Sequence, residues 1–95
     1  MKAIKFIIQD GLTANNVTMY KQQFERMIHS ESQYEEMVLD LAETENIDSV
    51  GVTFVINVYK RLKSLDKHFR VEGASKDVQS LFKLMKLDQF FEMTD

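Results

Sequence analysis

Apolar and polar residues follow two different periods along the first half of the chain. Residues 2–9 alternate apolar and other side chains around Phe6 and stop at Asp10-Gly11, which is typical of a strand buried on one face. Residues 17–28 repeat apolar side chains at helical spacing and predict an amphipathic helix, which follows three good N-cap residues, Thr13, Asn15 and Asn16. A short apolar run over residues 37–41 predicts a second strand, and residues 42–48 predict an acidic loop.

The segment over residues 49–65 gives two opposing signals. Its β-branched residues favour a strand by propensity, whereas its length and the spacing of Val52, Ile56 and Tyr59 favour a helix with Asp48 as N-cap. Residues 68–72 then predict a third strand, residues 75–85 predict a last helix, and residues 87–93 close the domain. This alternation predicts an α/β fold in which a small mixed β-sheet packs against about three to four helices.

Composition supports one compact unit. The 95 residues, of which 44% are hydrophobic, suffice for a single domain that spans residues 1–95. The chain has no cysteine, which excludes a disulfide framework and a thiolate metal site. No apolar run approaches the roughly 18 residues that a membrane span needs, so we expect a cytoplasmic protein without membrane insertion. A net charge of −3 argues against direct nucleic-acid binding.

Residues with catalytic or metal-binding chemistry are sparse and scattered. His29 and His68 lie far apart in the sequence, and no nucleophile and base stand at a recognisable spacing. The acidic residues between Asp40 and Asp48 indicate a solvated loop rather than a magnesium site. We therefore expect neither an enzyme nor a metal or cofactor site.

Ser49 is the one residue whose position suggests regulation. It follows Asp48 at the predicted start of a helix, where a serine lies on the surface and the helix dipole favours a negative group such as a phosphate. It also stands where the charge changes sign, because residues 1–48 carry 4 Lys/Arg and 9 Asp/Glu, and residues 49–95 carry 8 and 6. A serine at a helix start can equally be structural, and both interpretations remain open at this point.

The order of these motifs resembles the STAS domains, the fold of sulphate-transporter and anti-sigma-factor-antagonist domains. A strand that ends in Asp40-Leu41 is followed by a loop and by Asp48-Ser49-Val50-Gly51 at the start of a long helix. The resemblance extends from residue 4 to about residue 93. In the anti-sigma-factor antagonists of this family, a partner that is both anti-sigma factor and serine kinase phosphorylates the serine after the aspartate, which implies that Ser49 is the phosphorylation site.

The resemblance also implies a surface that binds an anti-sigma factor, a serine kinase or a related signalling protein. This chain departs from the family at Thr13, where an aspartate usually helps to form that surface, and at Val50, where a smaller residue is usual. From the resemblance we also expect one strand of the family to be missing before Lys2. The implied partner-binding residues come from two segments: Leu12, Thr13, Asn15 and Asn16, and Asp48, Ser49, Val50, Gly51 and Val52.

Three functions remain compatible with the sequence. The first is a phospho-switched binding module that binds its partner when Ser49 is unphosphorylated and releases it when Ser49 is phosphorylated. The second is a constitutive STAS scaffold or transporter-regulatory subunit. The third is an acyl carrier protein with phosphopantetheine on Ser49, which requires an all-helical fold.

Overall fold

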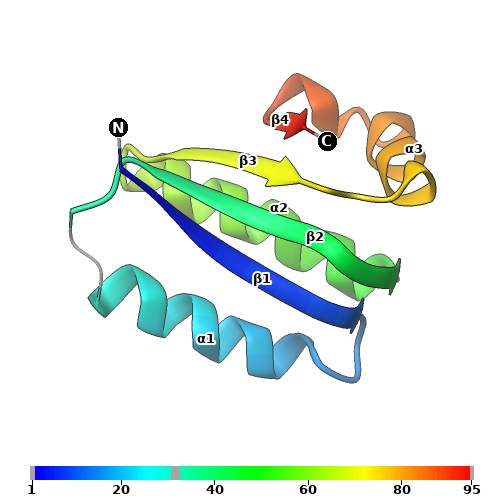
Figure 1. Ribbon diagram of the computed structural model, residues 1–95, viewed down its shortest axis with the longest axis horizontal. Helices are drawn as coiled ribbons and strands as arrows, with labels where there is room; N and C mark the ends of the chain where they lie inside the picture. The colour runs from blue at the N-terminus through cyan, green and yellow to red at the C-terminus, as the bar shows by residue number, and fades with distance from the viewer. Residues whose placement is uncertain (1, 31–32, 95) are drawn as a thin grey trace.

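Strands and helices alternate along the chain and form a sheet with helices packed against it (Figure 1). The computed structural model describes residues 2–30 and 33–94. The elements, in chain order, are β1 (Ala3–Leu12), α1 (Val17–Ser30), β2 (Glu36–Ile47), α2 (Ser49–Ser64), β3 (His68–Glu72), α3 (Lys76–Leu84), the short 3₁₀ helix η1 (Leu87–Gln89) and β4 (Glu92–Thr94).

The strands lie in the order β1-β2-β3-β4, which is also their order in the sequence. Each described strand pair is parallel, because a helical connection returns the chain to the same end of the sheet before the next strand begins. The predicted α/β fold is thus confirmed, although the described strands form a parallel sheet and not the expected mixed one. The presence of a sheet also excludes the all-helical carrier protein.

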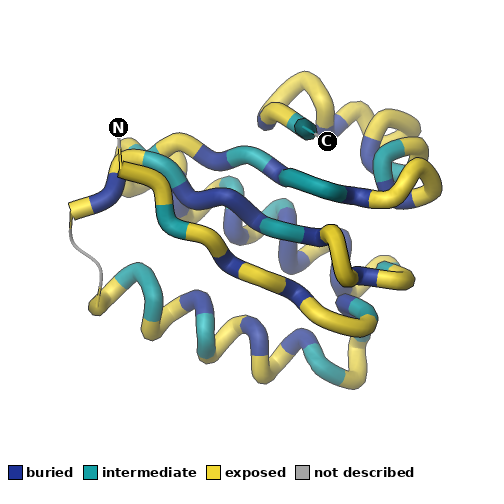
Figure 2. Tube along the Cα trace, in the orientation of Figure 1, coloured by how far each residue is buried: buried dark blue, intermediate teal, exposed yellow. Residues whose placement is uncertain are grey.

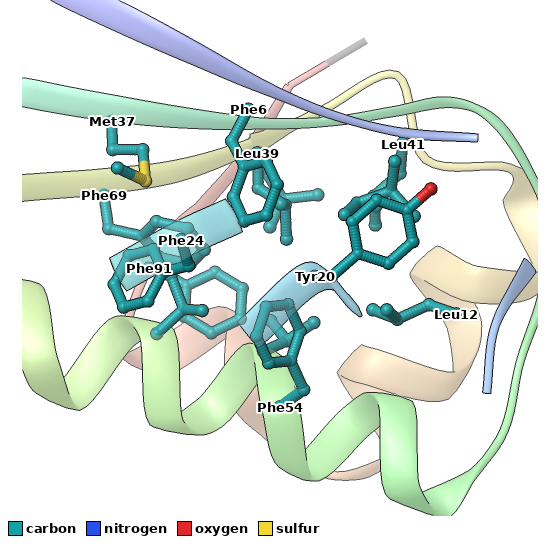
Figure 3. Packing of buried hydrophobic residues seen from close by; sticks show 14 of the residues in the cluster. Phe6, Leu12, Tyr20, Phe24, Met37, Leu39, Leu41, Phe54, Phe69 and Phe91 are labelled. Carbon is teal, nitrogen blue, oxygen red and sulfur yellow. The ribbon is translucent and has the colours of Figure 1, made fainter. Parts of the chain in front are cut away.

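The core lies between one face of the sheet and the helices. Phe6, Leu39 and Val71 occupy this face on three neighbouring strands and are at most 2% exposed. Figure 2 shows the resulting alternation of buried and exposed positions along β1. The ring of Phe6 stacks on Phe24 of α1 with 6.2 Å between ring centroids and meets Phe54 of α2 edge-on at 6.3 Å (Figure 3). These aromatic contacts fix both helices against the sheet.

Both long strands extend further than the sequence predicts. β1 does not stop at Asp10-Gly11 but continues to Leu12, and Asp10 takes a left-handed conformation with φ 67° where the register with β2 shifts. The bulge therefore absorbs the residues that normally end a strand. The predicted acidic loop over residues 42–48 is strand up to Ile47, because Thr44 is buried and donates a hydrogen bond to the carbonyl of Ile8 at 2.8 Å.

Charged side chains occupy the opposite face of the sheet. Lys5 Nζ lies 3.0 Å from a carboxylate oxygen of Glu72, and the guanidinium of Arg70 lies 3.2 Å from the other one and 3.4 Å from Glu36. The hydrogen bond from Lys5 is the main cause that lowers the pKa of Glu72. This face is therefore charged, but its charges are paired across three strands.

Candidate phosphorylation and docking surface

The start of α2 is fixed by its N-cap residue. Asp48 has an extended backbone, and its Oδ1 accepts a hydrogen bond from the amide of Gly51 at 2.9 Å. Its carbonyl accepts the first intrahelical hydrogen bond, from Val52 at 2.9 Å. The predicted cap and helix start are therefore confirmed, and Ser49 is the first residue of the helix.

Asp48 also joins the helix to the connection between β1 and α1. Its second carboxylate oxygen, Oδ2, accepts a hydrogen bond from the amide of Ala14 at 3.0 Å. The bonds from Gly51 and Ala14 stabilise the charged form and lower the pKa of Asp48. One carboxylate thus holds together the two segments in which the partner-binding residues were predicted.

The connection itself is held by local hydrogen bonds. Asn16 Oδ1 accepts from the amide of Thr13 at 2.9 Å, and the Asn16 side-chain amide donates to the carbonyl of Gly11. Thr13 in turn accepts from the amide of Asn15 through its hydroxyl at 3.2 Å. Residues 13–16 therefore form a compact turn with a defined position relative to α2.

Gly51 allows this turn and the helix to come close. A Cβ atom added to Gly51 would lie 2.0 Å from the carbonyl oxygen of Leu12 and 2.8 Å from a side-chain carbon of Ile47. The first turn of α2 therefore packs directly on the backbone at the end of β1, and only glycine fits there.

The predicted residues divide into an exposed and a buried group. Ser49 and Asn15 are exposed, and Val50 is 41% exposed, so all three can meet a partner. The members that are half-buried at the edge of this surface are Thr13, Asn16 and Asp48. The members that lie in the interior, and so position the surface without forming it, are Leu12, Gly51 and Val52.

Ser49 has a free hydroxyl within the described part of the chain. Its carbonyl accepts a hydrogen bond from the Thr53 hydroxyl at 2.9 Å, but its own Oγ makes none among the described residues. The Gly51 amide, which could bind a phosphate at this helix end, is already occupied by Asp48. A phosphate on Ser49 would therefore project from the surface next to an ionised carboxylate.

An apolar hollow beside Ser49 was not anticipated from the sequence. It has a volume of about 380 Å³ and lies between the start of α2 and the end of α3, with Leu81 and Met85 on the α3 side. Met85 is 44% exposed. The apolar stripe of α3 indicates a helix packed on a core, but it does not reveal that its last turn reaches the neighbourhood of Ser49.

Other kinds of site find little support in the described ranges. Residues 2–30 and 33–94 contain no group of three acidic, histidine or cysteine side chains arranged to hold a metal ion. Among the described helices, none has the length and the apolar character needed to cross a bilayer.

Comparison with known structures shows the same fold in proteins of low sequence identity. A candidate anti-sigma factor antagonist from Thermotoga maritima superposes with a TM-score of 0.87 at 21% identity, covering 98% of this chain and 79% of that one. The unphosphorylated form of the anti-sigma factor antagonist SpoIIAA gives 0.75 at 14% identity, with 99% and 80% covered. A sulfate transporter family protein from Wolinella succinogenes gives 0.80 at 8% identity, with 98% and 76% covered.

The protein-family model described as "Mlab, STAS domain" matches residues 7–94, which is nearly the whole chain. This match includes β2, the cap Asp48 and the serine at the start of α2. The chain therefore belongs to the STAS domain family.

Proposed function

We propose that this protein is a phospho-switched protein-binding module of the anti-sigma-factor-antagonist type. Its partner would be an anti-sigma factor with serine kinase activity or a related signalling protein. The observation that carries the proposal is the exposed Ser49 hydroxyl next to Asp48, whose carboxylate already caps the helix and holds the neighbouring turn. In this proposal the module itself catalyses no reaction.

The switch would act through charge. A phosphate adds about −1.5 to −2 charges at neutral pH. Because Asp48 already occupies the Gly51 amide, that amide does not bind the phosphate, and the added charge lies on the exposed surface that would face the partner. Every 1.4 kcal/mol lost at an interface lowers affinity about tenfold, and placing an unpaired charge against a like charge costs more than that. One phosphate would then suffice for release without a change of fold.

The first test is the modification state. Intact-mass analysis of protein isolated from its native cell distinguishes a phosphate from an unmodified chain, and fragmentation locates the phosphate. We expect phosphorylation on Ser49 and its loss in Ser49→Ala. Phosphorylation that persists in this variant would reject the assignment.

The second test is binding. Once the kinase that modifies Ser49 is identified, calorimetry should show at least about tenfold weaker binding for Ser49→Asp than for the wild type, and little change for Ser49→Ala. Both variants should fold normally, because an acidic residue in the first helical turn is compatible with the helix dipole. Equal affinities of the two variants for the kinase would refute the proposed phospho-switch.

A constitutive subunit is the second candidate. It is favoured by the similarity of the fold to a sulfate transporter family protein. In this case the same surface would bind a partner permanently, and Ser49 would remain unmodified in the cell. The intact-mass measurement therefore separates the two candidates.

A further inference from the structure

Two apolar hollows follow one another along the side of α2 that faces α3 and η1. The first, near Ser49, has Val52 at its floor and Met85 on its far wall. The second, of about 240 Å³, lies between Ile56 of α2 and Phe90, the residue that follows η1. Val52 and Ile56 are four residues apart, so the hollows occupy neighbouring turns of one helix face. Together they form what we call the α2–α3 groove.

The walls of this groove contain unusually exposed apolar side chains. Phe90 is 57% exposed and Met85 44% exposed, although both contribute to a concave apolar surface. The ring of Phe90 lies 6.0 Å from that of Tyr59, so it is positioned by packing and does not project freely. Exposed apolar side chains that line a preformed groove are typical of a surface that binds another protein.

The groove is basic at the end away from Ser49. Lys60 lines the second hollow, and Lys63 one turn further on lies 5.8 Å from the centre of the Tyr59 ring. Lys86 lies in the connection between α3 and η1, which together form the wall opposite α2. The acidic groups of the same elements are Asp77 in the first turn of α3, Asp88 on η1 and the N-cap Asp48, which is held by the amides of Gly51 and Ala14 at the opposite end. The surroundings of Tyr59 therefore favour an acidic occupant.

The groove is better suited to bind a helical segment of a partner than a strand. Helical residues line most of it, from α2 on one side and from α3 and η1 on the other, and strand β2 contributes only its last residue, Ile47. A bound strand would therefore find little strand backbone to pair with. A helix satisfies its own backbone hydrogen bonds and needs only an apolar face. From Ser49 to Lys60 the axis of α2 rises by roughly 16 Å, which corresponds to about three helical turns.

We propose that the α2–α3 groove binds an acidic amphipathic helix of the partner protein, with its apolar stripe on the two hollows and its carboxylates against Lys60 and Lys63. This inference rests on the proposed function, because it concerns the same partner. It also gives the switch a physical target: a phosphate on Ser49 stands at the mouth of the groove, where it repels an acidic helix and leaves the hollows intact.

The test uses a synthetic helix-stapled peptide of about 14 residues, or roughly four turns, with leucines at positions i, i+3 or i+4 and i+7 and glutamates on its flanks. A peptide of the same composition without the stripe is the control. In NMR titrations of the full chain, the striped peptide should shift the amides of Thr53, Ile56, Met85 and Phe90, and the control peptide should not. Equal binding of both peptides, or binding of neither, would overturn the proposal.

Matched variants locate the binding site. Phe90→Glu should weaken binding of the striped peptide at least about tenfold, whereas Leu84→Glu should change it less than about twofold, because Leu84 is 80% exposed and lines neither hollow. Lys60→Glu, at an exposed position, tests the acidic preference independently of packing and should also weaken binding. Equal effects of Phe90→Glu and Leu84→Glu would refute the groove. Shifts of the groove amides on concentrating the protein alone would instead identify a second copy as occupant.

The inference and the proposed function fail separately. If Phe90→Glu abolishes peptide binding but Ser49→Asp leaves it unchanged, the groove stands and the switch is rejected. If the native kinase binds the Ser49→Asp variant weakly but binds the Phe90→Glu variant as well as the wild type, the switch stands and the groove is rejected.

Discussion

Replacement of Gly51 by alanine tests whether the start of α2 is packed on β1 as closely as the structure indicates. The added Cβ would lie 2.0 Å from the carbonyl oxygen of Leu12, which is backbone and cannot rotate away. To relieve this clash, the helix and the end of β1 must separate by more than about 1 Å. Overpacking of this kind typically lowers the free energy of unfolding by about 1–3 kcal/mol. A helix gains about 1 kcal/mol when glycine becomes alanine, so a clash at the upper end leaves a net loss of about 2 kcal/mol.

Urea and thermal unfolding measure this loss directly. For a domain of this size, about 2 kcal/mol lowers Tm by roughly 8–16 °C. The amide of Ala14 should also shift in NMR spectra of Gly51→Ala, since its hydrogen bond to Asp48 spans the same gap.

Gly11 provides a matched control for this experiment. A Cβ at Gly11 would lie 2.1 Å from Oδ1 of Asn46, the end of a side chain that can turn aside. We therefore expect Gly11→Ala to lose less than about 1 kcal/mol. A Gly51→Ala variant as stable as the wild type, or a Gly11→Ala variant that loses equally much, would refute the close packing of α2 on Leu12.

Two further predictions concern pH and buried hydroxyls. Because the hydrogen bond from Lys5 holds the pKa of Glu72 below its ordinary value of 4.5, ionised Glu72 stabilises the fold above that pH, and this contribution is lost as the pH falls through the lowered pKa. The urea midpoint should therefore fall more steeply below pH 4.5 in the wild type than in Glu72→Gln, and parallel slopes would argue against the pair. The Tyr20 hydroxyl bonds both the amide and the carbonyl of Gln9, so Tyr20→Phe should lose about 1 kcal/mol in urea unfolding. The buried Tyr34 hydroxyl has no hydrogen-bond partner within the described residues, so Tyr34→Phe should be neutral or stabilising in the same assay, and an equal loss in both variants would refute this distinction.

The sequence predicts those features of the site that are determined locally. An aspartate before a long apolar helix is a strong N-cap signal, because the hydrogen bond that the Asp48 carboxylate accepts from the amide of Gly51 spans only three residues. The position of Ser49 as the first helical residue follows from that bond. The family resemblance then implies a role for Ser49, phosphorylation, which the spacing of residues alone does not predict.

The sequence pattern does not predict features that depend on contacts between residues far apart in the chain. The strand over the predicted acidic loop forms because Thr44 reaches Ile8, 36 residues earlier in the chain. Similarly, Met85 and Val52 have the apolar character of core residues, and only the packing of α3 beside α2 leaves one exposed and the other buried. Periodicity identifies an apolar face but not whether another element covers it.

Under the proposed function, Asp48 stabilises the start of α2 and Ser49 carries the regulatory charge, so the two roles fall on different residues. If the serine hydroxyl capped the helix, its phosphorylation would disturb the bond that fixes the start of α2 and would change the fold as well as the surface. In this chain the cap is the preceding carboxylate, and the serine contributes only its backbone to the described hydrogen bonds. We therefore expect that a charge added to Ser49 leaves the helix, the adjoining turn and the α2–α3 groove in place, so that the proposed switch acts on the partner alone.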